Sequence, residues 1–169
     1  TEAADVITGA ETLNRLREKS LIQQTDEDEN VVTFIMLETL REYALEKLIA
    51  SNELESMQSR HADYYLQLTE TAEPHLTRER QAEWFHRLEI EQNNLQAALD
   101  WRIANADYQQ AGRMVGVLWR FWSAHSRLSV GTNWIEQVLT HAQSLTPSVH
   151  AKVLHGAGRL FLLQYRYPE

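Results

Sequence analysis

Residues 34–48 read FIMLETLREYALEKL, and they change from a strand-like pattern to an amphipathic helix within a few positions. Side chains alternate between the two faces of a strand, so Val32, Phe34 and Met36 are predicted to share one face. From position 37 the apolar residues recur with helical spacing. The predicted inward-facing positions of this helix are Leu37, Leu40, Ala44 and Leu48. The stretch thus separates a small mixed α/β part from a part made of helices only.

The residues before this stretch predict a helix and a two-stranded ribbon. Apolar residues at helical spacing indicate a helix over 11–20, and Leu21-Ile22 begins a first strand. The polar run QQTDEDEN then connects to a second strand over 31–36, as in a β-hairpin with a long loop. A helix followed by such a ribbon is the second half of a winged helix. The alternative is a small α+β cap without a nucleic-acid role.

The residues after this stretch predict consecutive helices. Asn52 with Glu55 and Asp107 with Gln110 are expected to cap two of them at their N-termini. Thr146 followed by Pro147 is a strong helix-start signal, because proline suits the first helical position. The predicted helices are 37–49, 53–73, 77–104 with a bend near 91–93, 107–125, 129–144 and one that begins at Pro147.

The composition is that of a soluble globular protein, with 43% hydrophobic and 24% charged residues. No apolar run reaches the roughly 20 residues that span a bilayer, so no membrane partner is expected. Cysteine is absent, which favours a reducing, cytoplasmic compartment. Residues 1–60 hold about twice as many acidic as basic side chains. This excess argues against a phosphate-binding surface there. The first residue is Thr, which indicates a piece of a longer protein.

A weak repeat with a period of 40 residues runs through the second half. The matched pairs are Ala111 and Ala151, Gly116 and Gly156, Phe121 and Phe161, Leu95 and Ile135, and Leu99 and Leu139. A helical repeat of this length is typical of an α-solenoid, in which each helix pair buries its apolar face against its neighbours. An ordinary helical bundle can also produce such matches.

The last segment resembles the first helix and turn of a tetratricopeptide repeat. The matching residues are Leu154, Ala157, Gly158, Phe161 and Tyr167. Residues 107–144 match less well, with Leu118 in place of a small residue. An array interrupted at this point leaves the apolar face of Leu160, Leu162 and Leu163 without a cap. We therefore expect either fraying at this end of the chain or a homodimer through this C-terminal repeat.

Five segments in the same order carry a wider family resemblance. They are LNRLREKSLIQQ (13–24), VTFIMLETLREYALEKL (32–48), RHADYYLQLTETAEP (60–74), LEIEQNNLQAALDW (88–101) and LWRFWSAHSRLSVGTNWIEQVL (118–139). Together they resemble the region after the nucleotide-binding core of STAND-type regulators (signal-transduction ATPases with numerous domains). These bacterial transcriptional regulators have an NB-ARC-like ATPase and include the antibiotic-regulatory-protein and LuxR-associated types.

The resemblance implies a mainly α chain, with the C-terminal part of a winged-helix domain over residues 1–50 and a tetratricopeptide-like region over 51–169. Its expected function is non-catalytic. It would couple a helical sensor arm to a nucleotide-binding switch by contacting a protein or an intramolecular domain. ATP or ADP and Mg²⁺ are expected in the full-length parent, and no cofactor is expected in this chain.

The resemblance also assigns a domain-coupling segment, made of Met36, Leu37, Glu38, Arg41 and Tyr43. Related switches carry Met-His-Asp where this chain has Met36-Leu37-Glu38, and their histidine contacts the β-phosphate of ADP. Leucine cannot donate a hydrogen bond to a phosphate. A Walker A motif is also absent, so this chain is not expected to bind or hydrolyse ATP by itself.

A DNA-binding winged helix is the alternative function. It would use the helix over 11–20 for recognition, with candidate contacts from Asn14, Arg15, Arg17 and Lys19. Glu11 and Glu18 share that helix, and the predicted wing reads Asp-Glu-Asp-Glu over 26–29. Because these carboxylates repel phosphate, binding of nucleic acid through this chain is not expected.

Catalytic and metal-binding motifs give little support to an enzyme. Glu83 and His86 are three residues apart and can share one helix face, but a di-iron bundle needs a second such pair and none is present. The sequence holds no GxSxG, HExxH or glycine-rich phosphate loop. We therefore predict no catalytic residue, no metal site and no enzymatic role.

The aromatic residues of the second half have two interpretations. Trp119, Phe121, Trp122 and Trp134 can fill the space between helices, as aromatic residues at helical spacing usually do. They can instead line a partner groove that attracts an acidic peptide through neighbouring arginines. The candidate partner-binding residues are Trp119, Arg120, Trp122, Arg127 and Trp134, with Arg113 also nearby in sequence.

Overall fold

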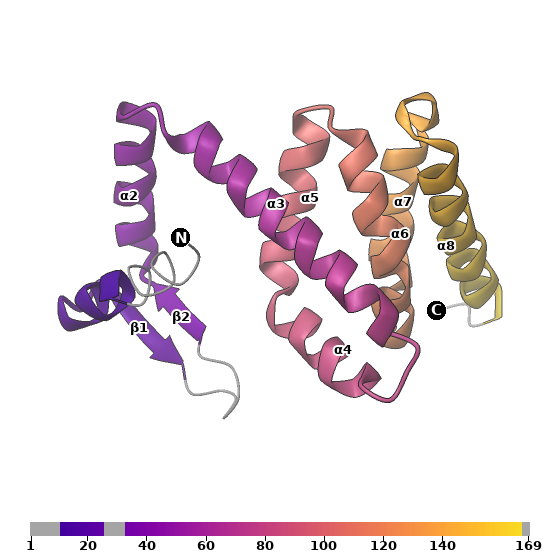
Figure 1. The fold of residues 1–169 in the computed structure, drawn as a ribbon, viewed down its shortest axis with the longest axis horizontal. Helices are drawn as coiled ribbons and strands as arrows, with labels where there is room; N and C mark the ends of the chain where they lie inside the picture. The colour runs from indigo at the N-terminus through magenta and orange to yellow at the C-terminus, as the bar shows by residue number, and fades with distance from the viewer. Residues whose placement is uncertain (1–10, 26–32, 167–169) are drawn as a thin grey trace. The chain divides into compact units, whose positions relative to one another are not determined.

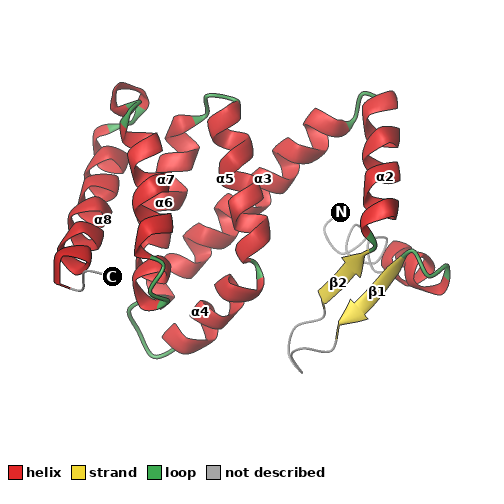
Figure 2. Ribbon diagram, turned by 180° about the vertical axis from the view of Figure 1, so that it is seen from behind, coloured by secondary structure: helices red, strands yellow, loops and turns green. Residues whose placement is uncertain are grey.

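The computed structural model describes residues 11–25 and 33–166, and leaves residues 1–10, 26–32 and 167–169 undescribed. The chain divides into two units, Thr1–Glu55 and Ser56–Glu169. Helices make up most of the described residues, together with one two-stranded antiparallel sheet (Figures 1 and 2). This confirms the prediction of a mainly α chain with a small β-hairpin.

The N-terminal unit contains a helical segment over residues 11–18, followed by strands β1 (Ile22–Thr25) and β2 (Thr33–Met36). The strands pair antiparallel, with Ile22 opposite Met36. As the alternation predicts, Ile35 is 56% exposed while Phe34 and Met36 are partly buried. The structure extends β1 into residues 23–25, which we had assigned to the connector, because the ladder pairs them with 33–35. The predicted acidic wing over 26–29 and Val32 lie outside the described residues.

Helix α2 (Glu38–Ala50) begins one residue later than predicted. Leu37 is its N-cap residue, with an extended ψ of 141°, and its side chain is 53% exposed. The assignment of Leu37 to the inward-facing stripe is therefore wrong. The other three positions of that stripe, Leu40, Ala44 and Leu48, are only partly buried, and no residue of α2 is fully buried.

Several helices end in a Schellman motif whose left-handed residue is not glycine. After α2, the N–H of Asn52 donates to the Ile49 carbonyl and the N–H of Glu53 donates to the Leu48 carbonyl. Asn52 has φ 57°, so it closes α2. The prediction that Asn52 is the N-cap of the next helix is therefore wrong. Asparagine tolerates this conformation better than most residues. Ser20, Ala106 and Ser126 occupy equivalent positions with positive φ.

The second unit is a sequence of helices joined by short connections. They are α3 (Leu54–Ala72), the 3₁₀ turn η1 (Glu73–His75), α4 (Gln81–Ile90), α5 (Gln92–Ala104), α6 (Tyr108–Ala124), α7 (Leu128–Leu139), η2 (Ala142–Ser144) and α8 (Pro147–Arg166). The predicted bend near 91–93 is confirmed as the break at Glu91 between α4 and α5. The predicted start at Pro147 is also confirmed. Among the described helices, none is long and apolar enough to cross a lipid bilayer.

Helix α6 is the centre of this unit and packs against α5, α7 and α8 (Figures 1 and 2). Ten of its residues are buried, including Met114, Val115 and Phe121. Close packing depends on glycine at its neighbour α7. A Cβ on Gly131 would lie 2.7 Å from atoms of both Leu160 and Trp122.

The pairs of the 40-residue repeat occupy different environments in α6 and α8. Phe121 is 1% exposed, whereas Phe161 is 38% exposed on the outer side of α8. Leu162 is also exposed, at 59%, but Leu160 is buried at 1%. The prediction that Leu160 belongs to an uncapped apolar face is therefore wrong, because Leu160 packs toward Gly131. Self-association through α8 stays a prediction.

Candidate interaction surfaces

An open apolar groove lies within the N-terminal unit. Its volume is about 880 Å³, and the stripe of α2 forms one of its sides. The apolar side chains that line it are Leu16, Leu21, Met36, Leu40, Ala44 and Leu48. Because the apolar residues of α2 line an open groove, this helix lacks the buried contacts that usually stabilise a helix in a protein. We refer to this feature as the α2 groove.

The rim of the α2 groove is polar and accessible. Tyr43 is 56% exposed, and the Lys47 ammonium lies 4.9 Å from the centroid of its ring. Ser51 and Glu53 also reach the groove. An apolar floor with a polar, aromatic rim is the usual composition of a protein–protein contact site.

The predicted domain-coupling segment is divided by the structure. Met36 and Tyr43 line the α2 groove, whereas Leu37, Glu38 and Arg41 do not. The Arg41 guanidinium pairs with the Glu38 carboxylate at the start of α2. The hydrogen bond from Arg41 lowers the pKa of Glu38 below its ordinary value.

The three candidate tryptophans are all buried, at 5–8% exposure. Trp119 packs toward α8, where a Cβ on Gly156 would lie 2.8 Å from its ring. Arg120 lies over the Trp119 ring, with its guanidinium carbon 4.4 Å from the centroid. Trp119 therefore belongs to the contact between α6 and α8, and Arg120 stacks on its ring from the same helix.

Trp122 and Trp134 meet at a different place, beside α5. The cavity there has a volume of about 20 Å³, which is enough for little more than one water molecule. Arg127 turns toward α4 and α5, where its guanidinium lies 2.5 Å from the Glu89 carboxylate and donates to Gln92. The structure thus does not bring the five candidate residues together. Burial of the rings supports the packing interpretation, and partner binding at this cluster stays a prediction.

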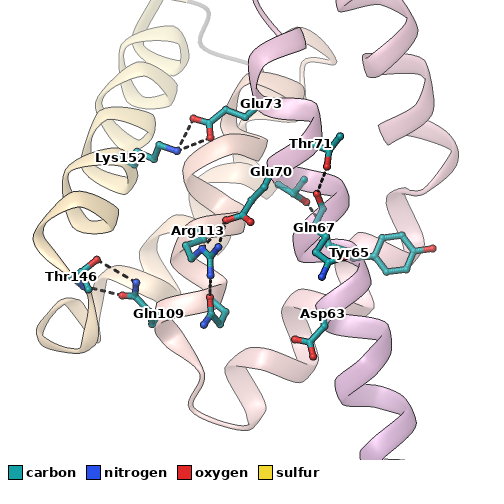
Figure 3. Close-up of polar contacts among 12 residues, drawn as sticks. Asp63, Tyr65, Gln67, Glu70, Thr71, Glu73, Gln109, Arg113, Thr146 and Lys152 are labelled. Atoms are coloured by element: carbon teal, nitrogen blue, oxygen red, sulfur yellow. Dashed lines mark hydrogen bonds and ion pairs between the residues drawn. The ribbon is translucent and has the colours of Figure 1, made fainter. Parts of the chain in front are cut away.

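A polar seam joins α3 to α6 and the following turn η1 to α8 (Figure 3). Glu70 accepts a hydrogen bond of 2.7 Å from Arg113, and Glu73 pairs with Lys152 at 2.6 Å. Sequence spacing gave no signal for these pairs, because their partners are 43 and 79 positions apart. Arg113 therefore lies in this seam.

A second polar contact involves the buried side chain of Arg102, which is 2% exposed. Its guanidinium donates to Asp63 on α3 at 2.8 Å and to Asp107 before α6. Asp107 is the N-cap residue of α6, but its side chain caps no backbone N–H. The predicted side-chain cap is wrong because Arg102 engages that carboxylate.

The residues of the DNA hypothesis are accessible. Asn14, Arg15, Arg17 and Lys19 are all exposed on or just after the helical segment over 11–18. Arg17 donates a hydrogen bond of 3.1 Å to Gln24 on β1. Nothing in this arrangement tests DNA binding, which stays a prediction.

The Glu83–His86 pair forms no metal centre with other residues. Glu83 accepts two hydrogen bonds from Arg80, at 2.9 and 2.6 Å, and hydrogen bonding to Arg80 lowers its pKa. Within residues 11–25 and 33–166, no three histidine, aspartate or glutamate side chains lie close enough to hold a metal ion.

Three mycobacterial proteins are similar to this chain. One is from Mycobacterium bovis and two are from strains CDC 1551 and H37Rv of Mycobacterium tuberculosis, and each is named a "Putative HTH-type transcriptional regulator". Each is 30% identical over 154 residues, which cover 89% of this chain and 17% of the relative. The chain thus spans about a sixth of the length of the curated relatives that it matches. No protein-family model matches the sequence, and no solved structure is significantly similar. Over most of its length, the chain is therefore similar to a segment of longer proteins that carry this name.

Proposed function

We propose that this chain is a non-catalytic protein-interaction region of a larger transcriptional regulator, which uses the α2 groove to contact another domain or protein. The observation that carries the proposal is the apolar stripe of α2, which lines an open groove and is not buried within the chain. The names and extent of the matched relatives support the regulatory context.

Covering the α2 groove supplies enough free energy for a specific contact. Full burial of one large apolar side chain stabilises by about 1.5–3 kcal/mol. Leu40, Leu48 and Tyr43 each have surface left to bury. A partner that covers all three can thus gain several kcal/mol, less the cost of ordering its own side chains. This range suits a contact that forms and releases during regulation.

More specifically, we propose that the partner is an NB-ARC-like ATPase, and that its ATP- or ADP-bound state determines whether the α2 groove is covered. The STAND resemblance supports this version. Leu37, at the position of the phosphate-reading histidine, is an exposed N-cap residue that cannot donate a hydrogen bond to phosphate. The segment from Met36 to Tyr43 would therefore act mechanically, by moving with α2, and not as a nucleotide ligand.

The helices α3 to α8 would form the sensor arm. Helices α6 and α8 lie 40 residues apart in sequence, pack against each other and hold glycines at equivalent positions, Gly116 and Gly156. This correspondence supports a tetratricopeptide-like arrangement, in which an inducer or a partner protein would bind. Signals would then pass from the arm to α2 through α3, which follows α2 directly.

The proposal is tested by changing the rim and floor of the α2 groove in the longer regulator. Tyr43→Ser and Leu40→Ser remove apolar contact area, whereas Glu42→Gln changes an exposed residue of α2 that does not line the groove. Transcription from a reporter under the regulator's own promoter is measured at equal protein abundance.

We expect both groove variants to change basal reporter transcription at least severalfold, because the contact that holds the switch is weakened. The Glu42→Gln control is expected to match the wild type. Wild-type transcription in both groove variants, with the protein folded and equally abundant, would sink the proposal.

DNA contact by this chain is the second candidate function, and the helix-turn-helix designation of the relatives favours it. The relevant surface is formed by the exposed basic side chains of Arg15, Arg17 and Lys19. Titration of the chain with random duplex DNA at low salt, followed by gel mobility, tests it. Micromolar binding that weakens steeply with salt and is lost in Arg15→Gln/Lys19→Gln would favour this candidate. No shift would remove it.

A further inference from the structure

A small polar notch lies between α3 and α4, away from the α2 groove. Its volume is about 190 Å³. On α3, Tyr64, Gln67, Leu68 and Thr71 share one face, with the spacing i, i+3, i+4 and i+7. Trp84 and Arg87 face them from one side of α4. Leu68 and Trp84 are buried, whereas the other four side chains are exposed and carry polar groups.

The indole of Trp84 carries a donor without an acceptor. Trp84 is 6% exposed, and its Nε1–H is buried with no hydrogen-bond partner among the described residues. A buried donor without an acceptor is destabilising and uncommon in native proteins. The ring itself is held in place, because His75 stacks on it with the centroids 5.1 Å apart and the planes 3° from parallel.

Arg87 brings a positive charge to the same notch. Its guanidinium carbon lies 5.2 Å from the centroid of the Trp84 ring. Among the described residues, Arg87 makes no ion pair. Stacking on an aromatic face leaves the N–H donors at the edge of the guanidinium free for a planar anion.

The carboxylates near Arg87 have other hydrogen-bond partners. Glu83 on the same helix accepts hydrogen bonds from Arg80, and the charge of Arg87 acts on it only as a weaker, additional cause of its lowered pKa. Glu70 on α3 is engaged by Arg113 and Glu91 accepts a hydrogen bond from Tyr65 at 2.7 Å. The notch therefore has a cation without an ion pair and an exposed Tyr64 with its hydroxyl, and it is also lined by Trp84, whose buried indole N–H has no acceptor among the described residues.

We propose that the notch between α3 and α4 binds a carboxylate group, held by the Arg87 guanidinium with the Trp84 indole N–H as a second donor. A guanidinium matches the two oxygens of a carboxylate with parallel hydrogen bonds. The volume suits one acidic side chain. That carboxylate belongs either to an acidic segment of a protein or to a free small acid, and the experiment below distinguishes the two sources. This site is independent of the α2 groove.

The test follows the indole N–H resonance of Trp84 by ¹H–¹⁵N NMR in the 169-residue chain. Trp84→Phe assigns that resonance among the five tryptophans, because it keeps an aromatic ring and removes the N–H. The probes are N-acetylglutamate, its neutral analogue N-acetylglutamine, and a blocked peptide of five glutamates with its glutamine counterpart. Inorganic phosphate is a further probe.

We expect a saturable shift of the Trp84 indole resonance with a glutamate probe and none with its glutamine analogue. Arg87→Gln is expected to weaken the binding at least tenfold, whereas Arg159→Gln, at an exposed arginine of α8, leaves it unchanged. Saturation with the peptide alone assigns an acidic protein segment, and saturation at similar concentration with N-acetylglutamate assigns a free acid.

Three results would overturn the proposal. The first is a Trp84 indole resonance that no glutamate probe moves. The second is an equal response to the neutral analogues or in Arg87→Gln, since the charge would then be irrelevant. The third is tighter saturation by phosphate than by either carboxylate probe.

Discussion

Arg102 has the most demanding environment of any single charged residue that the structure describes. Its guanidinium is almost completely buried, and its Nε–H has no partner among the described residues. The carboxylates that it pairs with differ, because Asp63 is 60% exposed and Asp107 is 33% exposed. Asp63 and Asp107 can therefore regain water if the cation is lost, which limits the cost of breaking the pairs.

Substitution of Arg102 should show how much of its role is packing. Arg102→Met keeps most of the side-chain volume and removes the unpartnered Nε–H, so we expect a loss of about 1 kcal/mol or less. Arg102→Ala also leaves a cavity and should cost about 2–4 kcal/mol. Urea unfolding measures both, with Arg80→Ala, at an exposed ion pair, as a control expected to leave the midpoint unchanged. Equal losses for Met and Ala would show that charge dominates.

The phenol of Tyr65 makes stability depend on pH in alkaline solution. Burial, followed by the hydrogen bond to Glu91, raises its pKa above the ordinary value near 10. The unfolded chain thus releases this proton first. The contribution of Tyr65 is fully present below about pH 10 and is lost as the pH rises above it, by at most ~1.4 kcal/mol per unit.

Tyr65→Phe should therefore flatten the alkaline fall in stability. The free energy of unfolding is measured in urea at pH 9 and pH 11 for the wild type, for Tyr65→Phe and for Tyr64→Phe, a change at a residue that is 52% exposed. We expect the decrease to shrink most in Tyr65→Phe, and less in Tyr64→Phe, because Tyr64 is only a minor cause of the raised pKa of Tyr65. An identical decrease in all three proteins would contradict this role.

At the scale of helix ends, the described positions with positive φ are occupied by residues other than glycine. Ala106 has φ 57° in the connection between α5 and α6. An L-residue in this conformation costs about 1–2 kcal/mol, part of which glycine recovers despite its greater flexibility when unfolded. Ala106→Gly is expected to stabilise by about 0.5–1 kcal/mol in thermal unfolding. Ala97→Gly, at an exposed interior position of α5, should destabilise by a similar amount.

At the scale of helix packing, two glycines have opposite surroundings. A Cβ on Gly131 would meet Trp122 and Leu160 at 2.7 Å, whereas a Cβ on Gly158 would meet nothing within 4 Å. Gly131→Ala is expected to destabilise by about 1–3 kcal/mol through overpacking. Gly158→Ala should stabilise by up to about 1 kcal/mol through helix propensity. Unfolding midpoints measured side by side test the pair, and two changes of the same sign would contradict the packing described here.

The elements were largely predictable because their signals are local. Proline at 147, the polar break near Glu91 and the alternation of Phe34, Ile35 and Met36 each act over a few residues. The caps at Asn52 and Asp107 were not predictable. Asn52 is instead part of the Schellman motif that ends α2, and the Asp107 carboxylate is bound by the buried Arg102. Sequence spacing alone indicates neither interaction.

At the scale of the whole molecule, the sequence predicted the α2 stripe but not its environment. Helical spacing of Leu40, Ala44 and Leu48 shows which side is apolar, and it does not show whether the same chain covers that side. The ion pairs of Arg113 and Lys152 could not be predicted for a related reason, since their partners, Glu70 on α3 and Glu73 in η1, are distant in sequence. Contacts of this kind depend on how helices pack together.

The central claim is that another domain or protein covers the α2 groove. The sequence has no cysteine, so single cysteines introduced at position 43 or 42 report on their own surroundings. The alkylation rate of Tyr43→Cys and of Glu42→Cys is measured by mass spectrometry of the α2 peptide. Each variant is compared in the 169-residue chain and in the longer regulator.

We predict that the cysteine at position 43 reacts at least tenfold more slowly in the longer regulator than in the 169-residue chain, whereas the cysteine at position 42 reacts at the same rate in both. Equal alkylation rates at position 43 in the two proteins would contradict the account, because the groove would then be open in the regulator as well.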